Sequence, residues 1–272
     1  MHSNDNQPDA AAHGLQGLGV LVTRPQHQAE PFCRLIEQAG GDAIRFPVLE
    51  VTDPGDSTAL NKRLDQLAEY QIAIFISANA VRYAMSRIQA RAGLPAGLRI
   101  AAIGRASARE LQHMGVEVND CPSRQFDSEA LLALPGFADV AGQRILIFRG
   151  EGGREHLASV LRERGATVDY AEVYRRIRPA ADTTNLMQRW ARGEIQVITL
   201  TSVEALRNLY ELVGKLGRQW LLHTDLIVAS ERIQQQAQSL GLSASITVAC
   251  NASDAAMLEC LVQWRQSHPF RE

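Results

Sequence analysis

The sequence of 272 residues predicts an α/β protein built from two lobes, each with a doubly wound parallel sheet. Short apolar, β-branched runs alternate with longer helical patterns, which is typical of parallel strands joined by crossover helices. The runs are apolar at almost every position, as expected of strands that are covered on both faces. The chain also repeats itself, which indicates two related lobes.

The expected elements follow from these patterns in chain order. Strands are expected at residues 20–23, 72–77, 100–103, 145–148, 197–200, 226–228 and 246–248. Helices are expected at residues 29–39, 107–114, 128–134, 155–164, 203–213, 233–239 and 255–264. All but one of these strands, the strand at residues 72–77, are followed by an expected helix, and this alternation favours parallel over antiparallel pairing.

The internal repeat has a constant offset across separate blocks. Residues 19–50 align without a gap on residues 144–175, and the same offset aligns residues 71–82 with residues 196–207. The aligned pairs include Arg24 with Arg149, Glu30 with Glu155, and Ser77 with Ser202. The repeat alone leaves two arrangements open: a cut near Gly142, or a swap in which the first βα unit joins the last third of the chain. Linker-like stretches at residues 52–57 and 178–183 favour the swap.

Composition and charge exclude several classes of protein. A net charge of -2 argues against a dominant basic face for nucleic acid. No apolar run is long enough for a transmembrane helix, so no membrane contact is expected. Residues 1–18 are expected to be a disordered tail and lack the features of a secretory signal. Four scattered cysteines without a CxxC motif predict reduced thiols and a cytoplasmic protein.

The candidate site consists of hydroxyl, glycine and arginine residues just beyond the predicted strands. Ligands of open parallel sheets gather at the carboxyl ends of the strands, where helix N-termini favour anions. Each serine or threonine there could serve only as a helix cap, but six such junctions together predict an anionic ligand. These positions include Thr23, Arg24, Ser77, Asn79, Ser107, Arg149, Gly150, Ser202 and Ser230.

Other kinds of chemistry find no matching motif. The sequence has no P-loop, no H-E-x-x-H pattern, no dense His/Cys/carboxylate cluster and no G-x-S-x-G elbow, so a catalytic metal is not expected. Tyr174 lies where the chain is expected to cross between the lobes. It could be a hydrogen-bond donor in a cleft there, because a phenol with a pKa of about 10 stays protonated, or only an amphipathic side chain at a domain seam.

A set of segments taken together resembles the uroporphyrinogen-III synthase family from Gly19 to Trp264. The segments are VLVTRP, FISANAV, AAIGRASARELQHMG, ILIFRGEGGREHLASVLRERGATVDYAEVYRR and TLTSVEAL. The resemblance implies two flavodoxin-like lobes joined by a two-stranded crossing, with residues 19–48 and 177–264 in lobe one and residues 49–176 in lobe two. It also implies a lyase that cyclises hydroxymethylbilane to uroporphyrinogen III, inverting the last pyrrole ring and losing water.

The resemblance further implies roles for individual residues. Tyr174 would assist departure of the hydroxyl group, and the strand-end positions given above would bind the substrate without cofactor or metal. One departure from the family pattern is Ile233, where a hydroxyl residue is usual, so Ser230 or Arg232 is expected to compensate. The expected protein is a monomer whose partner is a small molecule. The alternatives are a two-lobed anion-binding regulatory module without catalysis and, less favoured, a glycosyltransferase-like enzyme, which lacks its acidic residue here.

Overall fold

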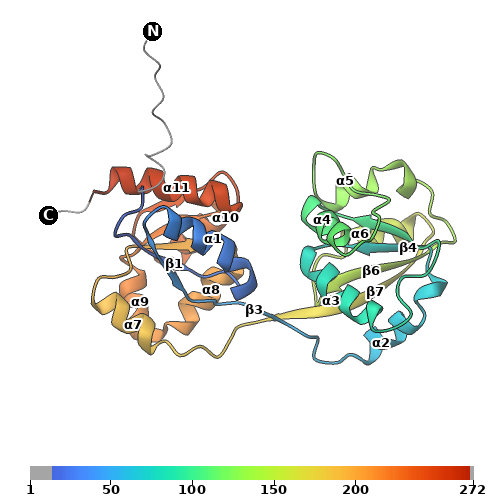
Figure 1. Ribbon diagram of the computed structural model, residues 1–272, viewed down its shortest axis with the longest axis horizontal. Coiled ribbons are helices and arrows are strands. Elements are labelled where there is room, and N and C mark those ends of the chain that lie inside the picture. Colours follow the sequence, from blue (N-terminus) through green and yellow to red (C-terminus); the bar gives the residue numbers. More distant parts are fainter. Residues whose placement is uncertain (1–13, 270–272) are drawn as a thin grey trace, which may run out of the picture. The chain divides into compact units, whose positions relative to one another are not determined.

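The computed structural model describes residues 14–269, which form two compact units (Figure 1). Unit 1 combines the chain up to Glu50 with the chain from Ile177 onward, and unit 2 runs from Val51 to Arg176. The alternative cut near Gly142 is therefore wrong, because that residue lies inside unit 2. Each unit holds one five-stranded sheet, and the predicted α/β class with two parallel sheets is confirmed.

Unit 1 is built on the strand order β10-β9-β8-β1-β2, in which every neighbouring pair is parallel. Its strands are β1 (Gly19–Val22), β2 (Asp42–Arg45), β8 (Val197–Leu200), β9 (Asp225–Val228) and β10 (Ile246–Val248). Helices α1 (Gln26–Gln38) and α11 (Asp254–Ser267) cover one face of the sheet. The other face is covered by α7 (Thr184–Ala191), α8 (Val203–Leu212), α9 (Gly214–Leu221) and α10 (Glu231–Ser239).

Unit 2 has the strand order β3-β7-β6-β4-β5, and β7, β6, β4 and β5 pair in parallel. Its strands are β3 (Glu50–Thr52), β4 (Ile72–Phe75), β5 (Arg99–Ala102), β6 (Arg144–Gly150) and β7 (Thr167–Ile177). Helices α2 (Thr58–Asp65), α3 (Ala78–Gln89) and α4 (Arg105–His113) cover one face, whereas α5 (Ser128–Leu132) and α6 (His156–Glu163) cover the other. The chain passes between the units in the neighbouring strands β3 and β7.

The expected tail is only partly outside the ordered fold. Residues 1–13 lie outside the described part of the chain, but the expectation of disorder is wrong for residues 14–18. Leu15 and Leu18 are buried against α1 and α11, and the Leu15 amide donates to the carbonyl of Ala39. Burial of two leucines offsets the conformational entropy that is lost when this short segment is ordered. The first residues are polar on average, and this average conceals the two buried leucines.

Three strands were missing from the expected set: β2, β3 and β7. Strand β2 reads DAIR and is an edge strand whose end residues are exposed, so it has no continuous apolar run. Strand β7 mixes buried, partly buried and exposed residues and includes Asp169 and Glu172. Both strands form because neighbouring strands supply their hydrogen bonds, which local composition does not reveal. Between residues 14 and 269, no helix combines the length and the apolar character needed to cross a bilayer.

Candidate functional site

Strand order places several predicted site residues at the point in each sheet where the winding direction reverses. In unit 2, β4 and β6 are neighbours, with β5 outside β4 and β7 outside β6. Ligands of doubly wound folds bind beyond the carboxyl ends of such a pair. Ser77 follows β4, and Arg149 and Gly150 end β6. In unit 1 the corresponding pair is β1 and β8, which are followed by residues 23–24 and by Ser202.

Tyr174 lies beside Gly150 and Ser77 within unit 2. A register shift in the β6–β7 pairing places Tyr174, rather than Val173, opposite Gly150. The phenol ring then lies so close to Gly150 that a Cβ atom there would be 2.6 Å from Tyr174 Cε2. The hydroxyl oxygen of Tyr174 is 3.3 Å from Ser77 Oγ. Glycine is therefore the residue that lets the phenol reach the hydroxyl group at the start of α3.

The hydrogen bonds of Ser77 fix how this pair can act. Ser77 is the N-cap of α3, and its Oγ accepts a hydrogen bond from the Ala80 amide at 3.0 Å. The hydroxyl hydrogen of Ser77 is thus available to donate to the oxygen of Tyr174. In that arrangement the phenolic O–H of Tyr174 remains available to donate to a ligand. Tyr174 itself is buried, and its ring packs against Tyr83 with the centroids 5.9 Å apart.

Two further predicted residues lie at neighbouring helix starts in unit 2. Asn79 is the second residue of α3 and is half-buried. Ser107 is the third residue of α4, just beyond β5, and is buried. Both therefore lie at the same edge of the sheet as Ser77, because β4 and β5 are parallel neighbours.

Arg149 is engaged by groups of unit 2 itself. Its side chain is buried, its Nη1 is 3.0 Å from Glu155 Oε1, and its guanidinium lies 4.4 Å from the centroid of the Tyr170 ring. The hydroxyl of Tyr170 donates to the other oxygen of Glu155 at 2.6 Å. Hydrogen bonds from Tyr170 and Arg149 lower the pKa of Glu155 below its ordinary value of 4.5. Arg149 is therefore a fixed positive charge held by its own carboxylate.

The corresponding residues of unit 1 are also held internally. Thr23 is fully buried and donates its hydroxyl to the Thr199 carbonyl at 2.8 Å. Arg24 is buried over the Phe32 ring and pairs with Asp254 at the start of α11. These contacts connect the junction after β1 to strand β8 and to the start of α11.

The last two predicted positions in unit 1 are serines that start helices. Ser202 is the N-cap of α8, and its Oγ accepts from the Ala205 amide at 3.0 Å. Ser230 is the N-cap position of α10, but its side chain makes no capping hydrogen bond. Ile233 is buried in the core beneath α10 and so presents no group to a ligand. The expectation that Ser230 or Arg232 replaces the hydroxyl group missing at Ile233 stays a prediction.

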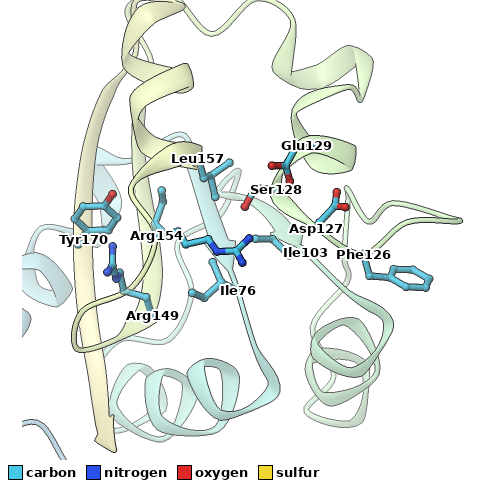
Figure 2. A pocket seen from close by; sticks show the side chains of 11 residues that line it. Ile76, Ile103, Phe126, Asp127, Ser128, Glu129, Arg149, Arg154, Leu157 and Tyr170 are labelled. Atoms are coloured by element: carbon cyan, nitrogen blue, oxygen red, sulfur yellow. The ribbon is translucent and has the colours of Figure 1, made fainter. Parts of the chain in front are cut away.

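A pocket of about 300 Å³ opens in unit 2, on the α5–α6 side of the sheet (Figure 2). Its floor is apolar, and charged and hydroxyl side chains surround it. It is lined by Ile76, Ile103, Phe126, Asp127, Ser128, Glu129, Ile147, Arg149, Arg154, Leu157 and Tyr170. Of these residues only Arg149 was predicted from the sequence as a site residue. The signal in the sequence for the other lining residues was the glycine pair Gly152-Gly153. These glycines lie where the repeat would place the first turn of the helix, and α6 begins only at His156.

Within residues 14–269, no cluster of three or more His, Cys, Asp or Glu side chains has the arrangement of a metal site. The four cysteines are all free thiols. Burial raises the pKa of Cys33 and Cys260, so these two thiols stay protonated at neutral pH. The polar groups at the sheet edges are hydroxyls, backbone amides and guanidinium groups, a set that suits hydrogen bonding to an anion.

Comparison with known proteins identifies the family of the chain. The sequence profile described as uroporphyrinogen-III synthase HemD matches residues 30–259. The uroporphyrinogen-III synthase of Escherichia coli (strain K12) is 35% identical over 246 residues, covering 90% of this chain and 100% of the relative. That of Salmonella typhimurium is 36% identical over 248 residues, with the same coverage. A mutant uroporphyrinogen III synthase from the extremely thermophilic bacterium Thermus thermophilus shares the fold, with a TM-score of 0.58 at 18% identity over 92% of this chain and 98% of that chain. The chain belongs to the uroporphyrinogen-III synthase family.

Proposed function

We propose that this protein converts hydroxymethylbilane into uroporphyrinogen III, as a lyase of tetrapyrrole biosynthesis. The observation that carries the proposal is the membership of the family over residues 30–259, together with the Tyr174–Ser77 pair at the switch point of unit 2. A linear tetrapyrrole with carboxylate arms is also the kind of ligand that strand-end hydroxyls and helix N-termini are suited to bind.

The reaction needs positioning more than strong acids or bases. The carbon–oxygen bond of the hydroxymethyl group breaks, and the hydroxyl leaves with a pyrrole N–H proton as one molecule of water. The substituted carbon of the last ring then attacks the resulting electrophilic carbon, giving a spiro intermediate that rearranges to the inverted ring. Since the bilane also closes unaided to the uninverted isomer, the enzyme must hold the last ring in the productive orientation.

We assign Tyr174 as the residue that assists departure of the hydroxyl. Ser77 can donate to the Tyr174 oxygen while its own oxygen is held by the Ala80 amide. The phenolic proton then points away from Ser77 and can form a hydrogen bond to the leaving oxygen. Such a donor stabilises the negative charge that develops on the oxygen as the bond breaks.

Binding of the carboxylate arms falls to the remaining strand-end groups in this proposal. Asn79 and Ser107 flank Ser77 at one edge of the unit 2 sheet, and Ser202 and Ser230 occupy the equivalent helix starts in unit 1. The N-terminal ends of these helices also favour carboxylate oxygens, because the helix dipole is positive there. Arg24 and Arg149 add positive charge near these turns. Each guanidinium group is held in place by its own carboxylate partner.

The direct test is the isomer composition of the product. Freshly generated hydroxymethylbilane is incubated with and without the purified protein, and the oxidised products are separated into type I and type III porphyrins. We expect mainly type III with the protein and only type I without it. Formation of type I alone at saturating protein would overturn the assignment. Tight binding of the bilane without type III formation would instead favour the non-catalytic anion-binding module.

A further inference from the structure

We propose that the pocket between α5 and α6 binds one pyrrole ring of the substrate with its carboxylate arm, and that Arg154 recognises this carboxylate (Figure 2). This assignment rests on the function proposed above and adds a binding residue to it. Arg154 lies in the loop between β6 and α6, a few residues beyond Gly150. It is thus on the same strand-to-helix junction as the groups that contact Tyr174, but on the other face of the sheet.

The loop that carries Arg154 is shaped for this purpose by two glycines. Gly152 and Gly153 have φ values of 71° and 115°, a backbone region that other residues rarely adopt. They delay the start of α6 to His156. In the repeat of unit 1 the equivalent helix begins at Gln26, and the residue aligned with Arg154 is Ala29, which is buried in the core. A position that serves packing in unit 1 therefore carries an exposed cation in unit 2.

Arg154 extends into the pocket toward Ser128, with Leu157 and Ile76 on either side (Figure 2). Among residues 14–269, no ion pair or hydrogen bond engages the Arg154 guanidinium. Two carboxylates line the same pocket and have other partners: Asp127 accepts from the Ala130 amide at 2.8 Å, and Glu129 lies 3.7 Å from the His156 ring. The planar fork of Arg154 is therefore available to a carboxylate brought by a ligand.

The rest of the pocket indicates what carries that carboxylate. Its floor is formed by isoleucine and leucine side chains from the sheet and from α6. A volume of about 300 Å³ is at the lower limit of small-molecule sites, which span roughly 300–1,000 Å³. The pocket thus suits a single flat ring and its arms and is too small for a whole tetrapyrrole. The charge of the buried Arg149 guanidinium in the wall is balanced by Glu155, so Arg154 is the cation that a ligand carboxylate would meet in this pocket.

The experiment compares the steady-state kinetics of wild-type protein and Arg154→Gln with hydroxymethylbilane. We expect KM to rise about tenfold for Arg154→Gln. This factor corresponds to the lower end of the free energy of a hydrogen bond to a charged group, which we choose because Arg154 is exposed to solvent. The maximal rate and the type III isomer fraction should stay near wild type, since the pocket holds a ring and not the reacting carbon. Arg109→Gln is the matched control: it removes an exposed positive charge from α4 in the same unit, outside the pocket, and should leave KM unchanged.

Two more measurements separate recognition in the pocket from a general effect of charge. Ser128→Tyr fills the pocket without changing charge and should raise KM to a similar extent. A set of bilane analogues, each with the carboxylate arms of one ring replaced by alkyl groups, identifies the ring that Arg154 binds. For one of these analogues the KM of the wild-type protein should rise, whereas the KM of Arg154→Gln should not rise further. Equal KM for wild type and Arg154→Gln, or an equal rise for Arg109→Gln, would overturn the pocket assignment. Failure of the proposed function would be seen separately, as absence of type III product with the wild-type protein.

Discussion

The two units share a strand-to-helix scaffold but equip it differently. Arg24 and Arg149, aligned by the repeat, are both buried, both lie over an aromatic ring and both pair with a carboxylate. At the position of Tyr174, however, unit 1 has Leu49, which is buried.

The same contrast extends to the loops that precede α1 and α6, the two helices that the repeat aligns. Unit 1 has Pro25 before an immediate helix, whereas unit 2 has Gly150 and a glycine-containing loop. The shared features stabilise the junctions, and the features found only in unit 2 supply a hydrogen-bond donor and a pocket. We infer that the chemistry belongs to unit 2 and that unit 1 contributes binding.

The largest effect is expected from Tyr174→Phe, which removes the phenolic donor and keeps the ring. General acid groups contribute roughly 100-fold or more, so kcat should fall by about that factor while thermal stability changes little. Tyr70→Phe removes another phenol of unit 2, one that donates to Asp169 away from the site, and should keep its kcat. A wild-type kcat for Tyr174→Phe would show that the phenol, which unit 2 has and unit 1 lacks, takes no part in the reaction.

Gly150→Ala tests the close approach that unit 2 alone possesses. The added methyl group would meet Tyr174 Cε2 and Cζ at 2.6 and 2.7 Å, so the ring must move. We expect a loss of about 1–3 kcal/mol in the free energy of unfolding, measured by urea denaturation, together with reduced kcat. In Gly104→Ala the new methyl group meets only Phe126 Cβ, at 3.5 Å, and this variant should unfold like the wild type.

The aligned serines give a matched pair of variants. Ser77→Ala and Ser202→Ala each remove an N-cap hydrogen bond and should each destabilise the protein by about 1 kcal/mol. Only Ser77→Ala also removes the partner of Tyr174, so it should lower kcat about tenfold, a value near that of one hydrogen bond to a reacting group. Equal loss of kcat in both variants would show that the two junctions act alike in the reaction.

The smallest effect concerns the pH dependence of the Arg149 pair. The pKa of Glu155 is lowered in the folded state by Tyr170 and Arg149, so the carboxylate stabilises the fold at pH values above its ordinary 4.5. This contribution is lost as the pH falls through the lower, folded-state pKa. Glu155→Gln should therefore reduce the melting temperature slightly at pH 7, and the difference from wild type should disappear in acid. A difference that is independent of pH would exclude ionisation of Glu155 as its cause.

Much of the fold could be predicted from periodicity. The strands at residues 197–200 and 246–248 coincide with β8 and β10. Strand β8 is fully buried, as its apolar run predicts, whereas the edge strand β10 is only partly buried. Strand β7 escaped prediction, since its exposed positions carry charges. The segment at residues 14–18 was misjudged because two leucines among polar residues gave no local pattern.

The candidate site residues lie at the strand ends, as the sequence predicted, but their contacts were not predicted. Strand ends pointed to Ser77, Gly150 and Ser202 because parallel strands deliver their carboxyl ends to one edge. The binding of Arg149 to Glu155 was not foreseen, although the two are six residues apart. Arg154 was also missed: one exposed arginine among many carries no signal until its loop and the surrounding pocket are seen.

The sequence by itself determined the α/β class, the alternation of strand and helix, and the relationship between the two halves, because each follows from hydrophobic periodicity and self-similarity. Only the tertiary structure decided that Tyr174 reaches Ser77, 97 residues away. That contact depends on β6 lying between β4 and β7 and on a register shift of one residue at Gly150. Strand order depends on packing across the whole sheet, and the hydrophobic pattern of one strand does not show which partner lies beside it or where the pairing shifts by one residue.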